Sequence, residues 1–273
     1  MIKKLIKKFQ ISSDEYVEKV DKMEIIITGH SHCFCMGVTP TGELRFERIE
    51  NDVPGVFGVM GGWDGSRNDA YWEFVAKHAQ NKRIVILWAG NQHNSGFIFA
   101  NEETFDFVSN PKDSESLSND KTIVPKSVLE QLFKSSLGGL PRVLEILKKG
   151  KPHDIILLET PRPKGDGDFI LPFIKSSAHF VELATKSGID IENLSISSLG
   201  FRLKLWRVIQ SQLADVAMSQ DVTYMRIPEQ FHTEEGGLKR EFWANDVTHA
   251  NSNYGKAMLK CIADEVLINS GSC

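Results

Sequence analysis

The segment EIIITGHSHC, residues 24–33, decides the fold, because a nearly uncharged, β-branched run passes directly into glycine and polar residues. A continuous apolar run of this length is typical of a strand buried on both faces of a sheet. The same pattern recurs in RIVILW (83–88) and HDIILL (153–158), and more weakly in VPGVFGVM (53–60) and VTYMR (222–226). The alternating segment LRFERI (44–49) predicts an exposed strand or hairpin.

Segments with helical periodicity separate these runs. Apolar residues recur at helical spacing from Tyr71 to Ala79, over about 201–219, and from Met258 to Leu267. Strands that alternate with helices favour a parallel sheet covered by helices on both faces. The sequence therefore predicts an α/β fold, a three-layer α/β/α sandwich of flavodoxin-like type with a mostly parallel central sheet.

Composition narrows the class of protein. The chain has 273 residues, of which 41% are hydrophobic, enough for one sizeable core. Its net charge of −4 argues against a nucleic-acid partner, since such proteins usually carry a basic excess. The four cysteines do not form a disulfide-scaffold pattern, and no apolar run reaches the roughly 20 residues of a transmembrane helix. We therefore expect a cytoplasmic protein with reduced thiols.

Two segments depart from the α/β rhythm. Residues 1–22 begin MIKKLIKKFQI, which predicts a basic amphipathic helical segment. It either packs on the protein or makes a weak contact with an anionic membrane surface through residues 1–10. Residues 95–125 contain NPKDSESLSNDK and predict a lid-like or disordered insertion. The remainder, residues 23–273, is predicted to be a single domain that carries this insertion.

Small and polar residues follow each predicted strand. Ligands of open parallel sheets bind outside the carboxyl ends of the strands, so these segments are expected to meet at one edge. They are GHSHC (29–33), GGWDG (61–65), AGNQHN (89–94) and ETPRP (159–163), with DVTHAN (246–251) before the last helix.

This set of residues matches the requirements of acyl transfer. Ser31 follows the first strand as a candidate nucleophile, and a serine needs a histidine base within hydrogen-bond reach. His249 is the candidate base, and Asp246, three residues earlier, is placed to orient it. The candidate oxyanion donors are the backbone of Ser31, the Gly62 N–H and the Asn91 side-chain amide.

In this order the motifs resemble those of the SGNH (GDSL-type) serine hydrolase family. That family has Gly-Asp-Ser after the first strand, Gly after the second, Gly-x-Asn-Asp after the third and Asp-x-x-His before the last helix. The resemblance spans about residues 24–268, and Asp246-Val-Thr-His249-Ala-Asn251 is its closest block. His30 replaces the family aspartate, Ala89 and Gln92 flank Asn91, and Gly61 and Gly65 compete with Gly62.

The resemblance implies an SGNH-like esterase that cleaves a carboxylic ester of a small molecule or glycan, such as an O-acetyl group on a sugar. It implies a Ser-His-Asp triad and an acyl-enzyme, with no cofactor and no metal. His32, Trp63 and His93 are predicted to line the substrate pocket; a loop position explains the two histidines equally, and core packing explains Trp63 better.

Other functions stay open at this point. An SGNH-like O-acyltransferase and a non-catalytic glycan-binding domain share the same motifs. A metal-dependent phosphoesterase is a further alternative, because Gly29-His30-Ser31-His32 resembles a metal-binding Gly-His-x-His. The early Asp-x-His that such enzymes need is missing upstream of residue 29. Capping or turn roles are the alternatives for Ser31, Asp246, His249 and Asn91.

Overall fold

A computed structural model describes residues 24–61, 68–99, 104–111, 113, 117 and 121–269, with side chains described to residue 264. The amphipathic segment predicted for residues 1–22, the candidate site residues Gly62 and Trp63, and parts of 95–125 lie outside the described residues.

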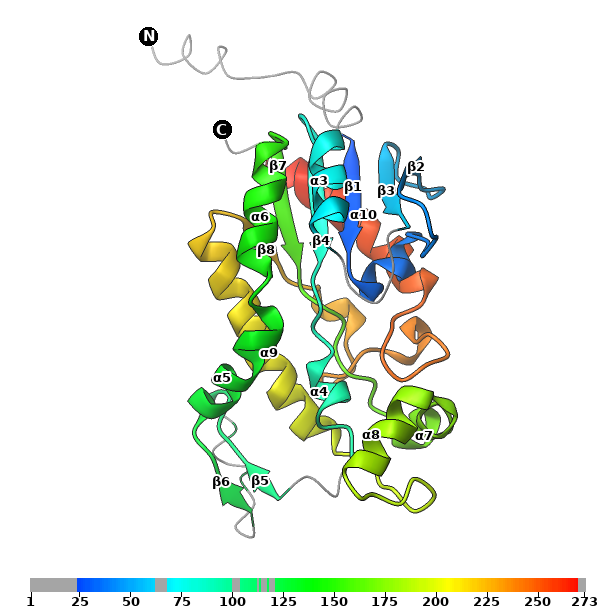
Figure 1. Cartoon of the computed structure of the whole chain (residues 1–273), viewed down its shortest axis with the longest axis vertical. Helices are drawn as coiled ribbons and strands as arrows, with labels where there is room; N and C mark the ends of the chain where they lie inside the picture. The colour runs from blue at the N-terminus through cyan, green and yellow to red at the C-terminus, as the bar shows by residue number, and fades with distance from the viewer. Residues whose placement is uncertain are drawn as a thin grey trace, which may run out of the picture.

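A six-stranded sheet forms the middle layer (Figure 1), in the order β2-β3-β1-β4-β7-β8. Neighbouring strands pair in parallel, except that β2 runs antiparallel to β3. The predicted mostly parallel α/β class is therefore confirmed. The strands are β1 (Ile25–Gly29), β2 (Arg45–Arg48), β3 (Val56–Met60), β4 (Arg83–Leu87), β7 (Asp154–Leu158) and β8 (Thr223–Met225).

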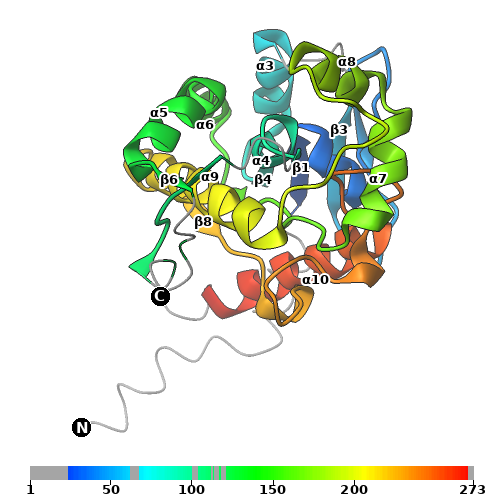
Figure 2. The same ribbon diagram turned by 90° about the horizontal axis from the view of Figure 1, so that it is seen from below.

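Alternate residues of the central strands supply two separate cores. Ile26 of β1 and Ile84 of β4 pack against α3, α5, α6 and α9, whereas Ile25 and Val85 face η1 and α10. Figure 2 shows α10 on the opposite side of the sheet from α3 and α6, which completes the predicted three layers. The bounds are α3 (Asp69–His78), α5 (Lys126–Leu137), α6 (Leu140–Lys149), α9 (Leu199–Ser219), α10 (Ser252–Asn269) and the 3-10 helix η1 (Ser31–Met36).

Shorter elements gather beyond the carboxyl ends of the strands, at the lower end of Figure 1. An apolar cluster that includes Phe99, Ile170 and Phe180 joins α7 and α8 there. These elements are α4 (Gln92–Ser95), α7 (Gly167–Ser176), α8 (Ala178–Lys186), the parallel pair β5 (Phe105–Asp106) and β6 (Thr122–Ile123), and the 3-10 helices η4 (Glu229–Phe231) and η5 (Arg240–Phe242).

The long helix α9 supports this end of the molecule. Its N-terminus is capped by Ser198, whose hydroxyl accepts a hydrogen bond from Phe201 N at 3.2 Å. Lys204 in its second turn donates to Asp106 of β5 at 2.8 Å in a buried ion pair. Among the described residues, no helix combines the length and the apolar character needed to cross a membrane.

Candidate active site

Ser31 owes its position to a glycine turn at the end of β1. Gly29 has φ +132°, and a Cβ atom there would lie 2.2 Å from Leu87 O on β4. Only glycine fits this close approach of two strands. The next residue, His30, donates its backbone N–H to the same Leu87 oxygen at 2.8 Å, and Ser31 then opens η1. The serine therefore stands at the carboxyl edge of the sheet.

His30, which stands where the SGNH pattern has aspartate, ties the serine loop to the next strand end. Its Nδ1 accepts a hydrogen bond from Ala89 N at 3.0 Å, and its ring lies edge-on to Trp88 with centroids 4.5 Å apart. Because Nδ1 accepts, a neutral His30 carries its proton on Nε2. The substitution thus supplies its own link between the loops that follow β1 and β4.

The structure brings Ser31, His249 and Asp246 together across 218 positions of sequence. His249 Nε2 lies 2.8 Å from Ser31 Oγ, and His249 Nδ1 lies 2.8 Å from Asp246 Oδ2. With the Nδ1 proton donated to the carboxylate, Nε2 is free to accept the serine proton. The His249 side chain is 32% exposed, so this group of side chains is in contact with solvent.

The carboxylate of Asp246 is held by its own loop. Its Oδ1 accepts backbone N–H groups from Thr248 at 2.7 Å and His249 at 2.6 Å. The same oxygen lies 3.2 Å from Lys164 Nζ. Partial burial alone would raise the pKa of Asp246, but the His249 hydrogen bonds and charge, with the Lys164 charge, hold that pKa well below its ordinary value.

Asn251 anchors the loop that carries Asp246 and His249. Its Nδ2 donates to Glu241 O at 2.8 Å and Trp243 O at 3.1 Å, and its Oδ1 accepts from Tyr254 N at 3.1 Å. The side chain therefore joins η5 to the first turn of α10. This explains the asparagine that closes the Asp-Val-Thr-His-Ala-Asn block.

His32 and His93, predicted as pocket residues, form a buried polar group beside the triad. They are only 3% and 2% exposed, and the His32 and His249 ring centroids are 5.2 Å apart. Burial, the largest cause, lowers the pKa of His32 well below its ordinary value and that of His93 to about 3. Within the described part of the chain, both ring nitrogens of His32, His93 Nδ1 and Asn94 Oδ1 have no hydrogen-bond partner.

The predicted oxyanion donors are only partly described. Asn91 is half-buried at the end of β4, next to the strand that leads to Ser31. The preceding Gly90 has φ +100°, and a Cβ there would approach the Thr160 side chain to 2.4 Å, so this turn also depends on glycine. With Gly62 outside the described residues, the oxyanion hole stays a prediction.

The metal-binding interpretation of Gly-His-x-His would need His30 and His32 as ligands. His30 already uses Nδ1 to accept the Ala89 N–H. In the described ranges, no three His, Cys, Asp or Glu side chains are grouped in a way that could hold a metal ion.

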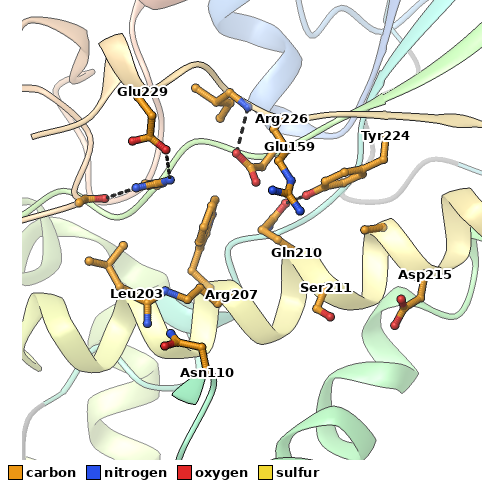
Figure 3. Close-up of a pocket in the computed structure, with 15 residues that line it drawn as sticks. Asn110, Glu159, Leu203, Arg207, Gln210, Ser211, Asp215, Tyr224, Arg226 and Glu229 are labelled. Carbon is orange, nitrogen blue, oxygen red and sulfur yellow. Dashed lines mark hydrogen bonds and ion pairs between the residues drawn. The ribbon is translucent and has the colours of Figure 1, made fainter. Parts of the chain in front are cut away.

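A cavity of about 650 Å³ lies between α9 and the segments that follow β7 and β8 (Figure 3). Arg162 and Glu229 on its wall form a 3.5 Å ion pair, and Arg162 stands over the Trp206 ring at 5.1 Å. Burial raises the pKa of Glu159, whose carboxylate accepts Ile227 N at 3.0 Å. No triad residue lines this cavity.

Lys164 is a contact of the site that sequence reasoning missed. It lies two residues beyond Arg162 and is only 1% exposed, with Nζ directed at the Asp246 loop. A lysine between proline and glycine normally marks an exposed turn, so its sequence neighbours carry no sign of burial.

No protein-family model and no curated protein matches the chain. Among solved structures, it is similar to a candidate acylhydrolase from Bacteroides fragilis, with 10% identity over 95% of this chain and 97% of that one, at a TM-score of 0.41. It is also similar to a carbohydrate acetylesterase from Sinorhizobium meliloti, with 10% identity, coverage of 90% and 98%, and a TM-score of 0.40. Similarity at this level carries no functional argument.

Proposed function

We propose that the protein is a serine esterase that cleaves a carboxylic ester through an acyl-enzyme. The observation that carries the proposal is the pair of 2.8 Å contacts that link Ser31 Oγ, the His249 ring and Asp246. This is the geometry that a hydroxyl nucleophile requires, with one ring nitrogen as base and the other oriented by a carboxylate.

The reaction has two halves. In the first, His249 Nε2 takes the Ser31 proton while Oγ attacks the ester carbonyl, and the oxyanion is held by the Ser31 and Gly62 N–H groups and the Asn91 amide. His249 then gives the proton to the departing alcohol, leaving an acyl group on Ser31. In the second half, His249 takes a proton from water as the water attacks the acyl carbonyl, and then gives that proton to Ser31 Oγ as the carboxylic acid leaves.

The proposed substrate is a small-molecule or glycan ester, and an O-acetylated sugar is the specific candidate. This choice rests on the SGNH-like motifs alone, which is a fold-level analogy. The chemistry uses side chains and backbone donors throughout, so no cofactor is proposed.

The test is hydrolysis of p-nitrophenyl acetate and butyrate by the wild type, Ser31→Ala and His249→Ala, with and without a chelator. We expect wild-type activity to survive chelation and each substitution to lower kcat by about 10³-fold or more. Matched controls are Ser219→Ala, at the exposed end of α9, and His153→Ala, whose side chain is 52% exposed. Both controls should keep wild-type rates.

Equal rates for the wild type and Ser31→Ala would refute the esterase proposal. Activity lost only on chelation would favour the metal-dependent phosphoesterase. Turnover that appears only when a sugar acceptor is added would reassign the same triad to acyl transfer.

A further inference from the structure

We propose that Lys164 is a positioning residue of the triad, which holds Asp246 through the carboxylate oxygen that the His249 ring does not use. The inference rests on the proposed function of Ser31, His249 and Asp246 and adds a fourth side chain to their arrangement. Lys164 does not contact the reacting atoms and acts through Asp246.

All the hydrogen-bonding capacity of the Lys164 ammonium group is directed at one short loop. Its Nζ donates to Asp246 O at 2.6 Å, to Ala244 O at 2.8 Å and to Asp246 Oδ1 at 3.2 Å. An ammonium group has three donors, and three acceptors within residues 244–246 satisfy them. The loop that carries the acid therefore closes around a single cation.

The backbone of Lys164 is fixed as firmly as its head group. Pro163 O accepts Leu238 N at 3.1 Å, and Lys164 forms a parallel bridge with Leu238. The Phe169 ring lies 5.6 Å from Nζ. Because both ends of the side chain are held, the ammonium group can define where Asp246 lies.

The charge of Lys164 also affects the base. Burial lowers the pKa of Lys164, and the charge of Asp246 and its hydrogen bond oppose that shift. A cation beside Asp246 offsets part of the negative charge that would otherwise favour an imidazolium at His249. The other groups that face this set are His32 from η1, itself beside His93 and His30, and Arg240 from η5, beside Lys164.

Removing Lys164 should therefore have two effects. Asp246 loses a fixed partner, so His249 is oriented less well and kcat falls, by about 10- to 100-fold for a displacement on the ångström scale. In addition, the imidazolium becomes more favourable, so the acidic limb of kcat/KM moves to higher pH.

The chain offers a matched control in Lys204. The side chain of this lysine is also buried, at 9% exposed, and its Nζ lies 2.8 Å from Asp106, but this pair joins α9 to β5 and not to the loop that carries Asp246. Lys204→Met removes a buried lysine–aspartate pair of the same kind. It should lower stability without changing the pH profile.

The experiment compares wild type, Lys164→Met, Lys164→Arg and Lys204→Met in p-nitrophenyl acetate hydrolysis over a range of pH, with rates normalised to folded protein. In parallel, NMR follows the titration of the His249 ring, which needs no turnover. We expect Lys164→Met alone to lower kcat with KM little changed and to move both the acidic limb and the His249 titration midpoint to higher pH. Lys164→Arg, which keeps the charge, should restore most of the wild-type kcat and most of the wild-type pH behaviour.

Identical kcat and His249 titration in Lys164→Met and Lys204→Met would overturn the proposal and leave Lys164 with a structural role only. If Lys164→Met does not fold, Lys164→Gln, which keeps a donor without the charge, should show the same titration shift. If Ser31→Ala equals the wild type, the esterase proposal fails separately, and the NMR titration still decides whether Lys164 is coupled to His249.

Discussion

Lys164–Asp246 and Lys204–Asp106 are alike in type and differ in surroundings. Both lysine side chains are nearly inaccessible, at 1% and 9% exposed, with partners at 3.2 and 2.8 Å. Asp106 is as buried as its lysine, at 8%, whereas the Asp246 side chain is 42% exposed and turns its second oxygen to His249. The Lys204–Asp106 pair ends inside the protein, whereas the Lys164–Asp246 pair continues to the His249 ring.

Burial of a charged pair therefore does not by itself indicate function. Each pair must offset the desolvation of its buried lysine, and each can do so through hydrogen bonds. What separates them is the next contact of the carboxylate, which is the Phe107 N–H for Asp106 and the His249 ring for Asp246.

The largest expected effect is the difference in kcat between substitutions of Asp246 and Asp106. Asp246→Asn should lower kcat for p-nitrophenyl acetate by about 10³- to 10⁴-fold, because an amide no longer fixes the His249 tautomer. Asp106→Asn should keep the wild-type rate per folded molecule but lose about 3–5 kcal/mol of unfolding free energy, since Lys204 is left buried and unpaired. Steady-state kinetics and urea unfolding of both variants measure this. Similar kinetic losses in the two would erase the distinction.

Asn91 is an uncharged candidate residue at the same carboxyl edge of the sheet as Ser31. Asn91→Ala should lower kcat by about 10²- to 10³-fold if its amide donates to the oxyanion, with little change in stability. The exposed Asn193→Ala, whose Nδ2 contacts Asp190 at 2.6 Å, is the control and should be silent. A loss of less than threefold would remove Asn91 from the oxyanion hole.

Loss of stability in acid is expected to arise from the buried histidines beside the triad. The folded pKa of His93, about 3, lies below its unfolded value, so the unfolded chain binds the extra proton first. Stability is therefore full above about pH 6.5 and falls with pH toward 3, by about 1.4 kcal/mol per pH unit for one histidine. Urea unfolding of His93→Gln between pH 7 and 4.5 should show a shallower slope than the wild type. An unchanged slope would contradict the assignment.

The smallest effect is expected for an exposed pair. Lys186 and Glu182 lie 2.6 Å apart on α8, with side chains 71% and 65% exposed. Glu182→Ala should change the unfolding free energy by less than about 0.5 kcal/mol, because water screens the pair. Thermal unfolding at low and high salt measures it. A larger loss of unfolding free energy would mean that side-chain exposure does not predict how much an ion pair contributes to stability.

Much of the fold was predictable because it depends on local pattern. The β-branched runs predicted β1, β4 and β7 to within a residue or so, and the apolar stripe predicted α9. The helices α5 and α6 were not assigned, although Leu129, Phe133 and Leu137 have helical spacing. Their turn has two adjacent glycines, 138 and 139, which obscured the pattern.

Site residues were predictable only where they belong to motifs defined by their spacing along the chain. Ser31, Asp246 and His249 follow from motifs at strand and helix ends, and the structure brings them into contact. Lys164 was missed because its depth depends on segments 80 positions away, which sequence periodicity does not report. The bond from Ala89 N to His30 was missed for the same reason.

The two edge strands of the sheet affect whether molecules of the protein associate at high concentration. Strand β2, at one end, reads Arg-Phe-Glu-Arg, and Arg45 and Glu47 form a 3.2 Å ion pair on the exposed side. Strand β8, at the other end, has only three residues. A charged strand and a very short one are both poor templates for a second chain. The sheet is therefore protected against edge-to-edge polymerisation, even though its interior strands are among the most aggregation-prone segments of the sequence.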